Sequence, residues 1–243
     1  MEYVQNKGEA EKDGTQPGAS VVPSVAFLLP SNRSPLAVSE LLHAAAESGA
    51  YAGCLFVLLL DRDDPTLAGY IETTENLAAD GRLSCGGLIF DGTPYAGKVN
   101  KAAMSVAAEH FCVIDPYHLP RPGEGGMADL IDVWAGCCAP QDMRVGCFGE
   151  VGAYPVVSRR VVERLGYLFH PLCYGRVEAE WWLGSLADAL GILSRIEGRV
   201  FESKIKNVDA EGWSSEEDGA WVRGVLEQLN DEEAGRLERF VIK

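Results

Sequence analysis

The alternation of apolar runs with amphipathic stretches predicts an α/β fold. One unbroken apolar run, Cys54–Leu60, passes directly into the acidic segment Asp61–Asp64. An apolar run of this kind is typical of a strand that is buried on both faces of a parallel sheet. Further short apolar runs predict strands at residues 25–29, 84–90 and 111–114.

Amphipathic stretches separate these predicted strands. The first stretch begins with Ser34-Pro35, which is typical of a helix N-cap followed by a proline in the first turn. Its apolar residues then recur at helical spacing, at Val38, Leu41, Leu42 and Ala45. Two more helices are predicted, from about Thr66 to Ala79 and around Val99–Val106. Strands that alternate with helices in this way predict a doubly wound, mostly parallel, Rossmann-like sheet in a single domain.

The second half of the chain has a less regular pattern. A strand is predicted at 143–148 and a last strand at 195–201. Ser158 and Gly166 are suited to begin and end a short helix between them. A longer helix is predicted from an apolar face that consists of Ala179, Trp182, Leu183, Leu186 and Leu190.

Composition sets the domain limits and excludes some classes of function. We expect a flexible polar tail over residues 1–23, the main domain over 24–203 and an acidic, helical extension over 204–243. The formal net charge of -15 disfavours general binding to nucleic acid or to anionic membranes. No window approaches the roughly 20 apolar residues of a membrane span. The seven cysteines lie mostly in apolar segments, which is typical of a reducing cytoplasm.

Polar side chains follow several of the predicted strands. Ligands of parallel sheets bind at the carboxyl ends of the strands, so these side chains are expected to converge on one crevice. Carboxylates there could accept hydrogen bonds from a nucleobase or ribose, and cations could meet a diphosphate. The candidates are Arg33, Asp61, Asp63, Asp64, Lys98, Asn100 and Asp115. Taken singly, each has an ordinary structural explanation, such as helix capping by Asp64 or Asn100.

Other patterns narrow the chemistry. The first strand is not followed by GxGxxG, and GxxxxGK[ST] does not occur, so the usual phosphate loops are missing. Glu178 and Glu180 lie near the start of the longer predicted helix. Because they are two positions apart, at most one of them can face a site. Such a carboxylate could act as a general base, or could simply complement the helix dipole.

The order of these segments resembles that of GT-A-type nucleotide-sugar glycosyltransferases, especially the compact enzymes of phages and bacteria. The resemblance spans about residues 24–202. The segments that resemble the family are Leu28–Arg33, Asp61–Pro65, Gly97–Ala102, Tyr154–Tyr167 and Glu180–Leu183. Each motif is short and degenerate, and their order is more specific than any one of them.

The resemblance implies a nucleotide-sugar donor and transfer of the sugar to a hydroxyl. It implies that Glu180, or failing that Glu178, is the base of an inverting displacement. The acceptor would be a glycan, a protein, a small molecule or, if the gene is viral, a modified DNA base. Arg159 and Arg160 fall in the segment that resembles the acceptor side. The expected location is the cytoplasm, which would be the host cytoplasm for a viral protein.

Two departures from the family bear on its metal ion. Where the family has a pair of acids after the fourth strand, this chain has Asp115 alone, followed by His118. The late histidine ligand of the family is replaced by the segment Phe201–Lys204. Asp115 with His118 could still hold Mn²⁺ or Mg²⁺ on the donor diphosphate. Metal-independent transfer, with Lys98, Arg33 or Arg121 as the positive charge, is an alternative. A protein that keeps the fold, binds a nucleotide or partner and has lost catalysis is a third.

Overall fold

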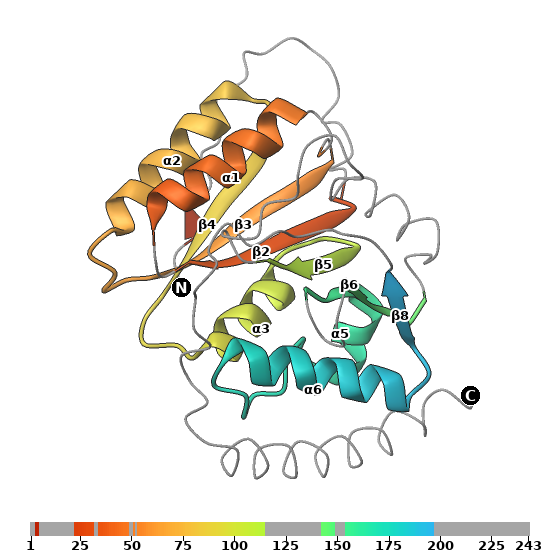
Figure 1. Cartoon of the computed structure of the whole chain (residues 1–243). Coiled ribbons are helices and arrows are strands. Elements are labelled where there is room, and N and C mark those ends of the chain that lie inside the picture. Colours follow the sequence, from red (N-terminus) through yellow and green to blue (C-terminus); the bar gives the residue numbers. More distant parts are fainter. Residues whose placement is uncertain are drawn as a thin grey trace, which may run out of the picture.

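The chain forms a mixed sheet with helices on both faces (Figure 1). The computed structural model describes residues 3–4, 22–31, 34–48, 51, 53–114, 142–148 and 154–196. The strands are β1 (Tyr3–Val4), β2 (Val25–Ser31), β3 (Cys54–Asp61), β4 (Ser84–Phe90), β5 (His110–Val113), β6 (Val145–Phe148), β7 (Val156–Ser158) and β8 (Leu193–Ile196). The helices are α1 (Pro35–Ser48), α2 (Leu67–Asp80), α3 (Tyr95–Ser105), α5 (Arg159–Leu165) and α6 (Arg176–Ala189).

The strand order in the sheet is β1-β4-β3-β2-β5-β7-β6-β8. Strands β4, β3, β2 and β5 are mutually parallel neighbours, which is the doubly wound half predicted from the sequence. Strand β7 is antiparallel to both of its neighbours, β5 and β6, whereas β6 and β8 are parallel. The sheet is therefore mostly parallel, with a reversed strand, β7, that joins its two halves and a short antiparallel strand, β1, at its edge.

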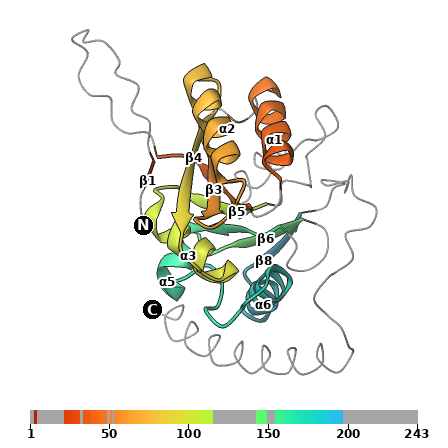
Figure 2. The same ribbon diagram turned by 90° about the vertical axis from the view of Figure 1, so that its left-hand side faces the viewer.

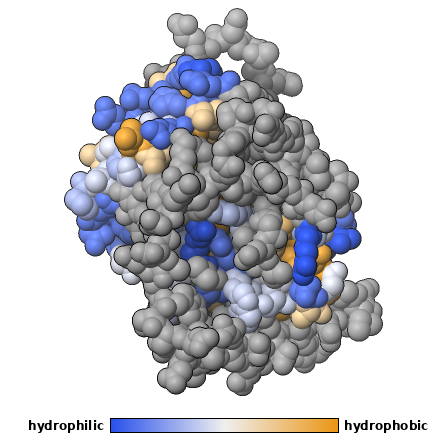
Figure 3. All heavy atoms as spheres, in the orientation of Figure 1, coloured by the Kyte–Doolittle hydropathy of each residue, from blue (hydrophilic) through white to orange (hydrophobic). Residues whose placement is uncertain are grey.

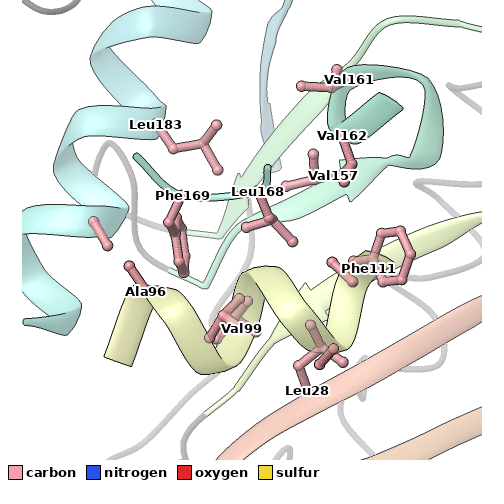
Figure 4. Packing of buried hydrophobic residues seen from close by; sticks show 14 of the residues in the cluster. Leu28, Ala96, Val99, Phe111, Val157, Val161, Val162, Leu168, Phe169 and Leu183 are labelled. Atoms are coloured by element: carbon pink, nitrogen blue, oxygen red, sulfur yellow. The ribbon is translucent and has the colours of Figure 1, made fainter. Parts of the chain in front are cut away.

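Two apolar layers enclose the sheet. Helices α1 and α2 cover one face, and α3, α5 and α6 cover the other (Figures 1 and 2). Alternate residues of β2 show the division, because Phe27 and Leu29 face α1 whereas Leu28 faces α3. On the α3 side, Val99 and Leu183 contribute to one continuous packed cluster (Figure 4). This two-sided burial explains why the strands appear in the sequence as unbroken apolar runs.

Glycines set two of the helix boundaries and one helix contact. Gly81 and Gly166 end α2 and α5 with φ of 69° and 82°, a left-handed conformation that glycine adopts without steric cost. Gly69 lies inside α2, where a Cβ atom would come within 3.2 Å of Pro35 Cβ. Glycine at this position therefore lets α2 pack closely against the start of α1.

Most predicted elements are confirmed, with three differences. Strand β7 was not predicted, because its three residues are too few to show a periodic pattern. The residues Tyr3–Val4 pair with Leu88 and Gly87 of β4 and form the short edge strand β1. The last strand begins at Leu193 instead of Arg195, and the residues after 196 lie outside the described part of the chain.

Candidate functional site

The carboxyl ends of the parallel strands form one edge of the sheet, and this edge is the candidate site. Asp61 is the last residue of β3 and pairs in register with Phe90, the last residue of β4. Ser31 at the end of β2 pairs with Leu60. In open α/β sheets, ligands bind in the crevice at this edge. In the view of Figure 3, hydrophilic side chains of described residues are visible near the middle of the surface.

Asp61 and Lys98 form an ion pair at this edge. The Nζ of Lys98, in the first turns of α3, donates a hydrogen bond to Oδ2 of Asp61. The side chain of Lys98 is 11% exposed and that of Asp61 is 22% exposed, so water screens the pair only partly. The structure therefore brings together two of the predicted donor-binding residues, one from the end of β3 and one from the helix after β4.

The two acids after Asp61 are placed differently from each other. Oδ1 of Asp64 accepts hydrogen bonds from the backbone N–H of Thr66 at 2.7 Å and from its hydroxyl at 2.6 Å. Asp64 thus stabilises the turn that leads into α2, close to the capping role considered from the sequence. Asp63 is exposed, and Arg62, between Asp61 and Asp63, pairs with Asp91 across the ends of β3 and β4. Of these acids, Asp61 is the one held against α3.

Asn100 has a structural role. Its Oδ1 accepts hydrogen bonds from the backbone N–H groups of Leu168 and Phe169 at 2.9 and 2.8 Å. Its Nδ2 donates to the carbonyl of Phe169 at 2.7 Å. The side chain therefore joins α3 to the segment between α5 and α6. Its predicted contact with a donor would require the same amide that these three bonds use.

Glu180 is buried near the start of α6, and it lies near the carboxyl end of β5. The residue is 7% exposed, and its Oε1 pairs with Nε of Arg176 at 3.1 Å. Burial of the Cys112 thiol in β5 raises its pKa, and the nearby negative charge of Glu180 raises it further. Of the two glutamates proposed as a base, Glu180 is thus the one directed toward the sheet.

Glu178 points to the backbone at the start of its own helix. Its Oε2 accepts hydrogen bonds from the N–H groups of Tyr174 and Gly175, at 3.0 and 3.3 Å. A carboxylate at this position satisfies donors that the first turn of a helix leaves free, and it complements the helix dipole. The sequence left open which glutamate faces the site, and the structure distinguishes the two by these contacts.

Tyr154 and Arg176 complete the surroundings of Glu180, and neither was identified from the sequence. The guanidinium carbon of Arg176 lies 5.2 Å from the ring centroid of Tyr154. Tyr154 has a φ of 45° and is 8% exposed. The next residue, Pro155, accepts a hydrogen bond from the N–H of Val113 at the end of β5, which fixes Tyr154 at the carboxyl edge. The i,i+4 spacing of Arg176 and Glu180 is the sequence signal that could have revealed the pair.

An aromatic cluster anchors α6 behind these residues. Trp182 is fully buried, and its ring centroid lies 5.4 Å from that of His170 and 5.9 Å from that of Tyr167. His170 and Tyr167 come from the segment that Asn100 holds in place. The packing of Trp182 therefore links the orientation of α6, and with it Glu180, to the position of α3.

Arg159 lies at the opposite edge of the sheet. Its backbone N–H donates to the carbonyl of Glu109, just before β5 begins. Its guanidinium donates to the carbonyls of Ala108 and Val106, and it lies 5.1 Å from the ring centroid of Phe111. The structure does not bring Arg159 together with Asp61, Lys98 or Glu180, and these contacts explain its presence without an acceptor.

Arg160 follows Arg159 in the first turn of α5 and is exposed. It begins a helix that starts at the amino end of β5, so it too lies away from the carboxyl edge. The predicted acceptor-side arginines and the predicted base thus occupy different ends of the sheet.

Three predicted site residues, Arg33, Asp115 and His118, lie outside the described residues. Within the described ranges, His, Cys, Asp and Glu side chains form no group of three or more that could hold a metal ion. The predicted metal ligands Asp115 and His118 therefore stay predictions. The helices of the described part include none that is long and apolar enough to cross a membrane.

Comparison with solved structures shows that this sheet and its helical layers share the GT-A type of fold. No protein-family model matches the sequence, and the comparison with curated proteins gives no match. The similarity therefore lies in the structure.

Three solved structures illustrate this similarity. A mannosyltransferase from Pyrobaculum calidifontis, PcManGT, in complex with GDP-Man and Mn²⁺, matches with a TM-score of 0.58 and 15% identity over 82% of this chain. S. aureus TarS 1-349 with UDP-GlcNAc matches with a TM-score of 0.60 and 11% identity over 84%. Glucosyl-3-phosphoglycerate synthase from Mycobacterium tuberculosis, with Mg²⁺ and UDP, matches with a TM-score of 0.51 and 13% identity over 88%.

The length of these proteins also matters. The present chain spans 62% of the mannosyltransferase, 65% of the TarS fragment and 83% of the synthase. At identities of this order, the comparison shows a shared fold.

Proposed function

We propose that the protein is a glycosyltransferase that moves a sugar from a nucleotide-sugar donor to a hydroxyl acceptor. The observation that supports this function best is the convergence, at one edge of a GT-A sheet, of the Asp61–Lys98 pair and the buried Glu180. The solved neighbours bind GDP-Man, UDP-GlcNAc or UDP. A donor is proposed to lie across the ends of β2, β3 and β5, in the crevice where such folds bind ligands.

The proposed roles follow from the chemistry of the side chains. Asp61 would accept hydrogen bonds from the base or ribose, and Lys98 would place its charge near the diphosphate. Arg33 and Asp115 are proposed to complete the donor site, and Asp63 would lie at its exposed rim. Glu180 would take the proton of the acceptor hydroxyl as that oxygen forms a bond to the anomeric carbon. The bond from this carbon to the diphosphate would break, and the diphosphate would leave.

A divalent ion is proposed as an optional part of this site. Two of these neighbours, the mannosyltransferase and the synthase, contain Mn²⁺ and Mg²⁺ respectively. Asp115 and His118 are the residues proposed to hold such an ion here, as oxygen and imidazole ligands. When bound, it would neutralise charge on the leaving diphosphate, a task that Lys98 could otherwise perform alone.

A catalytically inactive nucleotide- or partner-binding protein is the second candidate. The observation that favours it is that the key charges already have partners in the free protein: Lys98 with Asp61, and Glu180 with Arg176. A protein that had lost catalysis could keep both pairs for stability. Donor binding alone does not distinguish the two candidates, whereas turnover does.

Thermal-shift measurements with UDP-, GDP-, CMP- and dTDP-sugars, each with and without Mn²⁺, test donor binding. A donor present at a hundred times its Kd stabilises a protein by about 2.7 kcal/mol, which raises the Tm of a domain of this size by about 5–10 °C. We expect one nucleotide class to give such a rise. A shift that is the same without Mn²⁺ would favour metal-independent binding. The absence of any shift across the panel would contradict the proposed function.

A further inference from the structure

The buried carboxylate of Glu180 requires a compensating charge. At 7% exposure, Glu180 has lost most of its contact with water. An ionised carboxylate is costly to bury unless it is paired and hydrogen-bonded. Arg176 lies one turn earlier on α6 and meets Glu180 at 3.1 Å, and its own side chain is 30% exposed. The pair therefore extends from the interior toward the surface at the start of α6.

Arg176 is itself held by a residue from a different element. Its guanidinium lies over the ring of Tyr154, 5.2 Å from the centroid, in the geometry of a cation–π contact. Tyr154 has a φ of 45°, which a bulky residue adopts only when its surroundings enforce it. Tyr154 is anchored beside β5 through Pro155. Tyr154, just before β7, thus fixes Arg176, and Arg176 fixes Glu180.

We propose that Arg176, seated on Tyr154, is a positioning residue that holds Glu180 ionised and oriented toward the acceptor. This inference rests on the proposed function, in which Glu180 is the general base. A base must be deprotonated at the working pH and held within reach of the proton that it removes. A fixed guanidinium supplies both conditions, because it favours the charged form of the carboxyl and restricts its rotamers.

Three other titratable groups in the described part of the chain lie near the pair, and each is engaged elsewhere or neutral. Cys112 of β5 faces the region, and burial raises the pKa of its thiol, so it stays neutral. Tyr154 presents its ring to Arg176. Glu178, on the same helix, directs its carboxylate to the N–H groups of Tyr174 and Gly175. The positive charge that the described residues show beside Glu180 is that of Arg176, at 3.1 Å.

The pH dependence of kcat/KM in Arg176→Gln and Arg176→Lys tests the inference. Loss of a positive charge at this distance is expected to move the acidic limb of the profile upward by about one pH unit or more. Activity should then fall by up to about tenfold on the acidic limb of the profile and much less on its plateau. Arg176→Lys restores the charge and should return the limb close to its original position. Arg82→Gln is the matched control, because it removes an arginine from an exposed pair with Asp80 at the other edge of the sheet.

Titration of the Glu180 carboxyl carbon by NMR, assigned with Glu180→Gln, supplies a readout that does not need turnover. The titration midpoint should rise in Arg176→Gln and stay unchanged in Arg82→Gln. Tyr154→Leu keeps the charge of Arg176 but removes the ring that holds it, so the titration midpoint of Glu180 should rise by a smaller amount. This variant also tests the inference if Arg176→Gln does not fold. Equal midpoints in the wild type and both site variants would overturn the inference. An inactive wild type with a shifted midpoint would overturn the proposed function alone.

Discussion

The hydrogen bonds of Asn100 give a quantitative test of the structure. In Asn100→Ala, the two N–H groups of Leu168 and Phe169 lose their acceptor, and the carbonyl of Phe169 loses its donor. These three groups belong to Leu168 and Phe169, which are both fully buried. The change therefore removes three hydrogen bonds at once and releases the segment that leads from α5 to α6.

The expected loss follows from the number of bonds. Each intramolecular hydrogen bond contributes about 1 kcal/mol net, so three correspond to about 3 kcal/mol of unfolding free energy. For a domain of this size, that loss lowers Tm by about 6–12 °C. Asn100→Asp is the matched variant. It keeps the acceptor for both N–H groups but sets a carboxylate oxygen against the carbonyl of Phe169 in place of the Nδ2 donor, so its loss should come from that one contact.

Urea unfolding followed by fluorescence measures both variants. Donor affinity at permissive temperature should be unchanged in Asn100→Asp if the bonds to the backbone of 168–169 are the whole role of the side chain. A loss below about 1 kcal/mol in Asn100→Ala would refute the bonding that we describe. A large fall in donor affinity with normal stability would instead restore the prediction, made from the sequence, that Asn100 contacts the donor.

Two further predictions concern the amino edge of the sheet. Burial lowers the pKa of the His110 imidazole in the folded protein. The unfolded chain therefore takes up a proton at His110 more readily than the folded protein does. The stability that depends on neutral His110 is present above about pH 6.5 and is lost as the pH falls below that value. Urea unfolding at pH 7.5 and 5.5 should show a smaller decrease in His110→Gln, and an identical decrease would contradict this. Arg159→Leu removes the bonds to Ala108 and Val106 and should lower the unfolding free energy by about 2 kcal/mol with no change in acceptor KM. A raised acceptor KM with normal stability in Arg159→Leu would instead support contact between Arg159 and the acceptor.

The sequence predicted the parallel half of the fold because its signals are local. The run Cys54–Leu60 is buried on both faces of the sheet, and its composition shows this without reference to any other segment. Helix α1 begins at Pro35 as predicted, since proline is favoured in a first turn. The strand β7 escaped prediction because its three residues owe their conformation to pairing with β5 and β6.

The candidate site was predicted only in part, because the contacts within it depend on tertiary packing and not on local sequence. Asp61 and Lys98 were both identified, since each follows a predicted strand, and their direct pairing depends on the packing of α3 against the sheet. Arg159 was assigned to the acceptor side by resemblance, but the reversed direction of β7 carries it to the other edge. Tyr154 could not be identified, because nothing in the sequence indicates its positive φ or its contact with Arg176.

Paired measurements on Glu180→Gln test the central claim most directly. The donor that gives the largest thermal shift is titrated into the wild type and the variant by calorimetry, and release of the nucleoside diphosphate is then measured in the presence of a hydroxyl acceptor. Because glutamine keeps the size of the side chain but cannot take a proton, the variant should bind the donor with a similar Kd and lose turnover by at least a hundredfold. Unchanged turnover in Glu180→Gln would contradict the account.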